Sequence, residues 1–378
     1  MKINNILMVD LKSQYKKIKG EIDYSIINTI ESSQYIGGPQ VETFKLSLEN
    51  YLDVKHVIPC ANGTDALQIA LMALELKPGD EVIVPAFTYV ATAEVIGLLG
   101  LKPIMVDVDL DSFNISLKNL QKVISSKTKA IVPVHLFGQS APMEEIVHFA
   151  TKNNLFIIED NAQALGAEYT FKNGITKKTG TIGDIGCTTF FPSKNLGCYG
   201  DGGALFTNND KLAKKICMIA NHGQSIKYHH KLIGCNSRLD AIQATILNIK
   251  LKYLETYNLN RSKAAQFYTI GLSEIKELET PKLKTFSSHV FHQYTLKVKN
   301  NKRDDLKEYL SKNKIPSMIY YPIPLYRQEA FSSYVNSGFN LVNTEILSNQ
   351  VLSIPMHTEL EESTQQYIIK KIKTFFNG

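Results

Sequence analysis

A single lysine, Lys194, stands where a strand-like segment gives way to a glycine-rich loop. Residues 184–203 read DIGCTTFFPSKNLGCYGDGG, with β-favouring side chains first and Pro192 and four glycines after them. A lysine among small residues can lie beside a flat ligand, and a neutral lysine amine forms Schiff bases with carbonyl compounds. A lone lysine is more often an ordinary surface residue, so the function of Lys194 depends on what the fold brings beside it.

An acid and a glycine turn follow two other strand-like segments. Asp160 ends the apolar run LFIIED, and a buried acid at a strand end needs a cation or several donors. A protonated pyridine nitrogen would satisfy it, although an acid that caps the next helix is an open alternative. Gly63 and Thr64 follow HVIPC, where a helix start could bind phosphate. A plain helix start capped by Thr64 or Asp65 explains the same residues.

Aromatic residues follow a third strand-like segment. Phe87-Thr88-Tyr89 come directly after EVIVPA, and an aromatic ring there could stack on a planar ligand or belong to the core. A phosphate cradle, a stacking ring, a strand-end acid and an amine together are what pyridoxal phosphate requires of its protein.

Seven short apolar segments must position these residues. Several are continuously apolar, as strands covered on both faces are, and helical segments separate them. The pattern predicts an α/β protein with one large, mostly parallel, twisted sheet. Ligands bind beyond the carboxyl ends of the strands in such sheets. The predicted strands span residues 56–60, 81–86, 102–108, 129–136, 155–160, 185–191 and 203–208.

The chain length and element pattern predict two domains. Residues 1–250 form a large ligand-binding domain in this prediction, and residues 251–378 form a smaller α+β domain. A long amphipathic helix is expected over 237–257, at the boundary. The proline- and aromatic-rich segment 320–331 is rigid enough to border a cleft.

The net charge, the cysteines and the lack of long apolar runs argue against several classes of function. The net charge of +6 comes from dispersed lysines, so nucleic-acid binding is disfavoured while an anionic small substrate is favoured. The five cysteines lack metal-type CxxC spacing and are expected to be reduced thiols, with no metal site. No run is apolar enough for a signal peptide or a membrane span, so a cytoplasmic protein is expected.

The full set of motifs resembles the DegT-type sugar aminotransferases, pyridoxal-phosphate enzymes with the aspartate-aminotransferase fold. The resemblance runs over nearly the whole chain. It rests on YIGGPQV (35–41), NGTDALQIAL (62–71), PAFTYVATAEVI (85–96), EDNAQALGA (159–167), FFPSKNLGCYGDGGA (190–204), NSRLDAIQATIL (236–247), YYPIPLYRQ (320–328) and LSIPMHTEL (352–360).

The resemblance implies a role for each matching residue. Lys194 would be the Schiff-base lysine and proton shuttle, Asp160 would pair with the pyridinium nitrogen, and Gln163 would lie near the ring or its 3-hydroxyl. The other implied contacts are Gly63, Thr64 and Thr189 to the phosphate, with Thr189 where relatives have serine, Phe87 over one ring face, and Asn236 to the phosphate of a neighbouring subunit.

The resemblance also implies a homodimer with shared active sites, whereas Asn236 read without it is a cap-region residue before a helix. The family commonly has a histidine in the segment that here reads PLYRQ (324–328).

The implied reaction is transfer of an amino group from L-glutamate to a keto nucleotide sugar. The sequences of residues 190–203 and 228–240 most resemble those of enzymes that act on UDP-2-acetamido-3-keto-glucuronate. Such enzymes make precursors of cell-surface polysaccharides and glycans. Alternatives are a dTDP-3-keto-6-deoxyhexose substrate, a 4-keto sugar, and a pyridoxal-phosphate-binding regulator without turnover. A sugar dehydratase of the same fold usually has histidine in place of Lys194, and a nicotinamide enzyme would need the GxGxxG that this chain lacks after its first strand.

Overall fold

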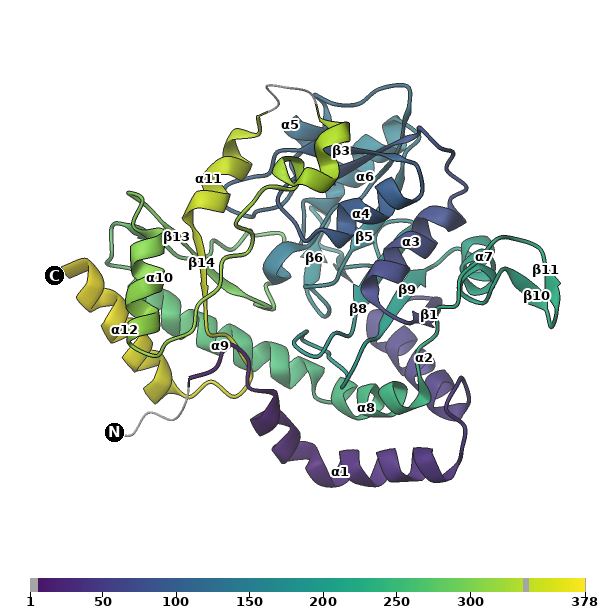
Figure 1. The fold of residues 1–378 in the computed structure, drawn as a ribbon, viewed down its shortest axis with the longest axis horizontal. Coiled ribbons are helices and arrows are strands. Elements are labelled where there is room, and N and C mark those ends of the chain that lie inside the picture. The colour runs from purple at the N-terminus through teal and green to yellow at the C-terminus, as the bar shows by residue number, and fades with distance from the viewer. Residues whose placement is uncertain (1–5, 336–339, 378) are drawn as a thin grey trace.

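The seven predicted strands form one sheet in the computed structural model, which describes residues 6–335 and 340–377. Their order across the sheet is β1-β9-β8-β5-β4-β2-β3. β9 pairs antiparallel with both β1 and β8, and the remaining pairs are parallel. The predicted mostly parallel α/β sheet is therefore confirmed (Figure 1). The strands are β1 (His56–Cys60), β2 (Glu81–Pro85), β3 (Lys102–Val106), β4 (Thr128–Ile131), β5 (Phe156–Asp160), β8 (Ile185–Thr189) and β9 (Gly203–Thr207).

Helices cover both faces of this sheet, which explains why its strands read as continuous apolar runs. Side chains on one strand alternate between the faces, so that Val82 and Val84 pack in one core cluster and Ile83 in another. The first face is covered by α3 (Gly63–Ala73), α4 (Ala91–Leu98) and α7 (Asp210–Ala220). The second face is covered by α2 (Pro39–Leu52), α5 (Leu117–Leu120), α6 (Met143–Lys152) and α8 (Ala241–Leu251).

The single long helix expected over 237–257 is wrong. The chain forms α8 and then α9 (Leu254–Leu272). Tight i to i−3 hydrogen bonds, from Lys252 N to Ile249 O and from Tyr253 N to Lys250 O, close the last turn of α8 before α9 begins. The two helices lie along the lower side of the sheet in Figure 1.

The C-terminal part contains a second, three-stranded sheet in the order β12-β13-β14. Its strands are β12 (Leu278–Glu279), β13 (Tyr294–Val298) and β14 (Val351–Ile354), and its helices are α10 (Arg303–Lys312), α11 (Val342–Gln350) and α12 (Glu362–Asn377). The division of the chain after residue 250 stays a prediction.

The remaining elements lie at the periphery of the central sheet. Helix α1 (Leu11–Glu31) packs along α8, and the hairpin of β10 (Gln224–Ile226) and β11 (His229–His230) projects beyond α7 (Figure 1). The others are the hairpin of β6 (Glu168–Thr170) and β7 (Thr176–Lys178), and the short 3₁₀ turns η1 (Leu136–Gly138), η2 (Leu325–Arg327) and η3 (Glu329–Tyr334).

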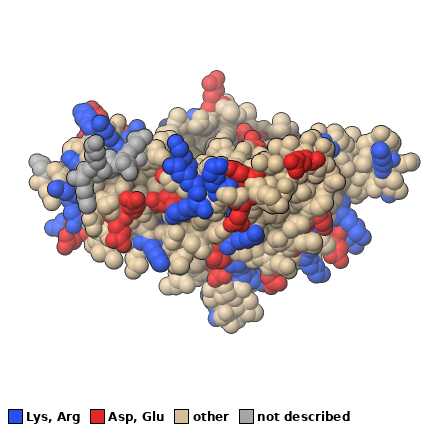
Figure 2. All heavy atoms as spheres, turned by 90° about the horizontal axis from the view of Figure 1, so that it is seen from below, with Lys and Arg blue, Asp and Glu red and all other residues tan. Residues whose placement is uncertain are grey.

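Charged side chains of both signs are interspersed on the face drawn in Figure 2. Where atoms are described on that face, basic side chains do not merge into one continuous surface. Within residues 6–335 and 340–377, no helix has both the length and the apolar character needed to cross a bilayer. The same residues contain no cluster of three or more His, Cys, Asp and Glu suited to a metal ion.

Two glycine substitutions test the packing of the sheet. A Cβ on Gly186 in β8 would lie 1.9 Å from the Gly180 carbonyl oxygen, so Gly186→Ala must displace backbone. We expect it to destabilise the protein by about 3 kcal/mol, the upper end of ordinary overpacking costs. The matched control is Gly20→Ala on exposed α1, where a Cβ meets nothing within 4 Å and should add about 0.5–1 kcal/mol through helix propensity. Urea unfolding measures both, and equal midpoints for the two variants would contradict this packing.

Candidate active site

A pocket of about 850 Å³ opens where the carboxyl ends of β1, β2, β5 and β8 meet. This is the edge at which α/β sheets bind ligands. The lining includes most of the residues that the sequence singled out: Gly63, Thr64, Asp160, Gln163, Thr189 and Lys194. Phe87 and Asn236 are not among the lining residues.

Lys194 reaches the pocket from the loop that follows β8. Its backbone N–H donates to Phe191 O (2.9 Å), which forms a tight turn at the strand end. Burial lowers the pKa of Lys194 to about 8, and the negative charge of Asp160 only partly opposes that shift. The neutral amine, which is the form that attacks carbonyl compounds, is therefore far more populated near neutral pH than it is for an ordinary lysine.

Asp160 faces the same pocket from the end of β5 and is almost fully buried, at 5% exposure. Its carboxylate accepts hydrogen bonds from Thr92 Oγ1 (2.8 Å) and Ala162 N (3.2 Å). Burial raises the pKa of Asp160, and these two bonds and the charge of Lys194 do not outweigh it. In the described protein Asp160 has no ion pair with Lys194, so the carboxylate can accept a cation from a ligand.

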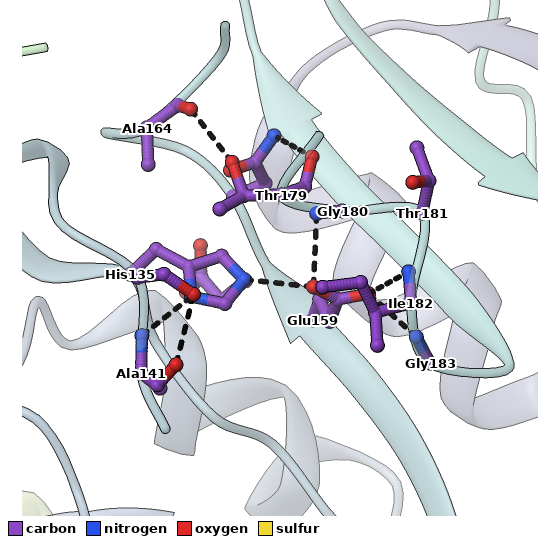
Figure 3. Close-up of polar contacts among 12 residues, drawn as sticks. His135, Ala141, Glu159, Ala164, Thr179, Gly180, Thr181, Ile182 and Gly183 are labelled. Atoms are coloured by element: carbon purple, nitrogen blue, oxygen red, sulfur yellow. Dashed lines mark hydrogen bonds and ion pairs between the residues drawn. The ribbon is translucent and has the colours of Figure 1, made fainter. Parts of the chain in front are cut away.

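The preceding residue, Glu159, has the opposite electrostatic environment (Figure 3). Its carboxylate, 0% exposed, accepts from His135 Nε2 (2.9 Å) and from the backbone N–H groups of residues 180, 182 and 183. Burial alone would raise the pKa of Glu159, but these donors outweigh burial and lower it.

The ring proton of His135 lies on Nε2, because Nδ1 accepts from Ala141 N (3.1 Å). Glu159 thus holds the turn before β8, while Asp160 is left open to the pocket.

The start of α3 forms another wall. Asn62, not Thr64 or Asp65, caps the helix, because its Oδ1 accepts from Asp65 N (2.8 Å). A Cβ on Gly63 would lie only 2.6 Å from Thr189 Cβ, so glycine allows β8 and the helix start to approach closely. Thr189 thereby lies beside the N-terminus of α3, where a helix dipole favours an anion.

Gln163 links two segments around the pocket. Its Oε1 accepts from Phe137 N (2.8 Å), and its Nε2 donates to the Tyr321 hydroxyl (3.2 Å). The Tyr321 hydroxyl can still donate its own proton, and burial raises its pKa. The proline- and aromatic-rich segment 320–331 borders a cleft as predicted, through Tyr320 and Tyr321.

The structure places Phe87 in the core, which corrects its expected position over a ligand. Phe87 is 1% exposed and packs against Phe113 and Tyr321. Tyr89, two residues on, lines the pocket and is 57% exposed. The strand β2 ends at Pro85, so strand alternation does not fix which of these rings faces the ligand.

Asn236 lines a separate hollow of about 450 Å³, together with Gly200, Arg238 and Gln243. Asp201 lines both hollows, so the two adjoin. The next residue, Ser237, ties this segment to α3, because its hydroxyl donates to Asp65 Oδ2 (2.6 Å). Asn236 is exposed and does not reach the pocket of its own chain.

Sequence reasoning missed His292 and Gln293, which enter the lining from the segment before β13. His292 is 6% exposed, and in the described part of the chain its Nδ1 has no hydrogen-bond partner. Burial, followed by the charges of Lys194 and Arg261, holds the pKa of His292 well below its usual range, so the ring is neutral. The only sign of these two residues in the sequence was that they are polar and lie between Phe291 and Tyr294.

This geometry fits a phosphorylated aromatic aldehyde. Lys194 supplies an amine, Asp160 a carboxylate for a ring cation, the α3 start and Thr189 an anion site, and Tyr89 an exposed aromatic face.

Comparison with known families and relatives agrees with this chemistry. The model of the DegT/DnrJ/EryC1/StrS aminotransferase family matches residues 16–373. A "pleiotropic regulatory protein" from Geobacillus stearothermophilus is 44% identical, with 98% of this chain and 99% of that protein covered. The UDP-2-acetamido-2-deoxy-3-oxo-D-glucuronate aminotransferase of Pseudomonas aeruginosa is 43% identical, with 96% and 98% covered.

A further curated relative and a solved structure extend this comparison. A dTDP-3-amino-3,4,6-trideoxy-alpha-D-glucose transaminase from Streptomyces venezuelae is 34% identical, with 97% of this chain and 94% of that protein covered. Among solved structures, NtdA of Bacillus subtilis with its cofactor PMP bound superposes with a TM-score of 0.92 at 30% identity. That superposition covers 100% of this chain and 86% of NtdA.

Neutralising Asp160 should stabilise the ligand-free protein. Because the folded-state pKa of Asp160 is raised, the cost of its ionised form grows as the pH rises above the unfolded pKa and is complete above the folded pKa, whereas below the unfolded pKa the cost disappears. Asp160→Asn should therefore raise the melting temperature at pH 8 more than at a pH close to the unfolded value of about 3.9.

The matched control is Asp201→Asn, whose carboxylate is exposed and whose change should leave the melting temperature nearly constant. Thermal unfolding of the ligand-free proteins measures both. A drop in stability for Asp160→Asn at pH 8 would refute the assigned electrostatics.

Proposed function

The chain belongs to the DegT/DnrJ/EryC1/StrS aminotransferase family, and we propose that it uses pyridoxal phosphate to move the amino group of L-glutamate to a UDP-linked 3-keto sugar. The observation that carries the proposal is that one pocket contains both Lys194, an amine with a pKa of about 8, and the buried Asp160, which forms no ion pair among the described residues. The products would be amino-sugar precursors of cell-surface polysaccharides or glycans, made in the cytoplasm.

The residues of the pocket would hold the cofactor at three places. The phosphate would lie at the start of α3, near Gly63, Thr64 and Thr189. The ring nitrogen would meet the carboxylate of Asp160, whose raised pKa would fall on contact with a cation. We assign the ring face to Tyr89 in place of Phe87, and Gln163 with Tyr321 to the polar edge of the ring.

When bound, pyridoxal phosphate supplies an aldehyde that condenses with amines and a ring that accepts the electron pair left at the substrate carbon. The protein's own groups do the rest. Nζ of Lys194 takes the proton from the amino-bearing carbon of the donor and later returns a proton to the acceptor sugar. Asp160 stabilises positive charge on the ring nitrogen throughout. His292, held neutral, adds no competing positive charge beside Lys194.

The charges of the pocket favour a site shared between two subunits. Its described lining contains Asp65, Asp160 and Asp201 but no lysine or arginine besides Lys194. Glutamate and a nucleotide sugar are both anionic, so further cations must come from outside this lining. Arg238 lies beside Asn236 in the adjoining hollow. We propose that a second copy of the chain brings these two residues to the pocket in a homodimer.

The sugar is the least constrained part of the proposal. A UDP-linked 3-keto uronate is favoured because the P. aeruginosa relative, 43% identical along nearly all of both chains, is named for that chemistry. A dTDP-linked 3-keto-6-deoxyhexose is the second candidate, since a relative at 34% identity is named as a dTDP-sugar transaminase. A 4-keto sugar ranks below both. The name of the Geobacillus relative keeps a regulator without turnover as a distinct alternative.

Addition of L-glutamate tests turnover directly. The cofactor-loaded protein should lose its yellow absorbance band when glutamate is added, and regain it with a UDP-3-keto sugar as 2-oxoglutarate is released. Lys194→Ala should bind cofactor through the phosphate and Asp160 yet lose turnover by about 10²–10⁴-fold or more.

Comparing UDP- and dTDP-linked keto sugars ranks the substrates. An absorbance band that glutamate leaves unchanged would instead favour the regulator, and near-normal turnover of Lys194→Ala would overturn the role of the lysine.

Mixing two weakly active variants tests the shared site. Lys194→Ala and Asn236→Ala homodimers should each be weakly active, but co-refolded mixtures should contain heterodimers in which one pocket has both native residues. Transaminase activity should therefore partly recover on mixing. Two copies of Lys194→Ala treated identically are the control. Activity that stays at the sum of the separate variants would contradict a contribution of Asn236 across the subunit boundary.

A further inference from the structure

Three polar side chains of α8 and α9 contact the Lys194 loop, and none of the three is part of the pocket lining. Gln243 Oε1 accepts from Tyr199 N (2.9 Å), Lys250 Nζ donates to Gly197 O, and Asn258 Oδ1 accepts from Asn195 Nδ2 (2.7 Å). Gln243 and Lys250 are seven residues apart on α8, which places them two turns apart on one face. The three contacts therefore form one row along the loop.

Lys250 is the unusual member of this row. It is 1% exposed, and in the part of the chain that the structure describes no carboxylate pairs with it. Its ammonium lies 5.3 Å from the ring centre of Tyr199, and burial lowers its pKa to about 8. A buried cation without a counter-charge costs stability that a methionine of similar length would not. The polar contact that it makes is with the backbone of the loop.

The Lys194 loop is compact, so a shift at Gly197 also moves Lys194. A Cβ on Gly197 would lie 2.4 Å from the Pro192 carbonyl oxygen, so residues 192 and 197 are in close contact. The chain between them includes Lys194, whose N–H is bonded to Phe191 O, and Cys198 N is bonded to Phe190 O (2.8 Å). A displacement of Gly197 therefore displaces the turn that aims Lys194.

Helix α9 also holds the part of the pocket wall that contains His292. Asn195 donates not only to Asn258 but also to Val290 O (3.0 Å). Arg261 on α9, 3% exposed, donates to the carbonyl oxygens of Phe291 (3.2 Å) and His292 (3.3 Å). His292, whose pKa the charge of Lys194 helps to lower, and Asn195, the neighbour of Lys194, are thus both held by side chains of α9.

We propose that Gln243, Lys250 and Asn258 form a polar row that positions the Lys194 loop, with Lys250 as its central positioning residue. The structural part of this inference is independent of the reaction. Its consequence for catalysis rests on the proposed function, because a displaced Lys194 would transfer protons poorly.

Lys250→Met tests the row, with Lys252→Met as the matched control. Both changes remove one lysine charge near the C-terminal end of α8, but Lys252, the residue that follows the helix, is exposed and pairs with Glu21 at 3.7 Å. Hydrogen exchange of residues 190–200 in the cofactor-free proteins is the first measurement. Lys250→Met should exchange at least about tenfold faster there, while Lys252→Met should match the wild type.

Transamination by the same variants is the second measurement. Lys250→Met should lower kcat by about 10- to 100-fold with little change in KM for glutamate, since a positioning loss acts on the proton transfer. Trapping of the cofactor on Lys194 by borohydride should slow in parallel. Exchange and kcat both at wild-type values in a folded Lys250→Met would overturn the proposal.

A second pair of variants covers the case in which Lys250→Met does not fold. Gln243→Leu removes the acceptor for Tyr199 N, and Gln243→Glu keeps an acceptor at the same length. We expect faster exchange and lower kcat for the first and recovery for the second, and equal behaviour of the two would refute the row. If the wild-type protein does not transaminate but exchange responds as expected, the proposed function fails while the positioning row stands.

Discussion

Two successive carboxylates at the end of β5 set the character of the whole site. Glu159 is fully satisfied by His135 and three backbone N–H groups, and it holds the turn that leads into β8. Asp160 faces the pocket instead and accepts hydrogen bonds from two donors in the described part of the chain, so burial keeps its charge costly. A bound cation is the partner that removes this cost. The sheet therefore keeps one acid for structure and the other for a ligand, and the position of β8, and so of Lys194, depends on the first.

The lysine beside this carboxylate is tuned by the same burial. Low polarity lowers the pKa of Lys194 and raises that of Asp160, so the charged form of each group is less favourable than it would be in water. The helices α8 and α9 add polar contacts behind the Lys194 loop where an apolar core would have sufficed for packing. The reactivity of Lys194 thus comes from its burial in the pocket, whereas the position of its loop comes from contacts with α8 and α9.

The sequence predicted the parts of the site that lie at strand ends. Asp160 and Lys194 could be found because runs of apolar residues mark strands, and the carboxyl ends of parallel strands meet at one edge. Phe87 and Tyr89 could not be told apart, because β2 ends before them and strand alternation no longer applies. His292 and Gln293 come from a segment about 100 residues further on, and only tertiary packing brings them to the pocket. The break between α8 and α9 was missed because no glycine or proline marks it.

The reversed direction of β9 has a consequence for the cost of assembling the site. Because β9 runs back beside β8, Thr189 pairs with Gly203, and the whole segment between them is a loop whose two ends are already joined by the sheet. The entropic cost of closing this loop is therefore met during folding. Little conformational entropy of the loop remains to be lost when a ligand binds. The reactive amine therefore lies on a segment that is already ordered before any ligand binds. The binding free energy of an incoming aldehyde is not reduced by the cost of ordering that backbone.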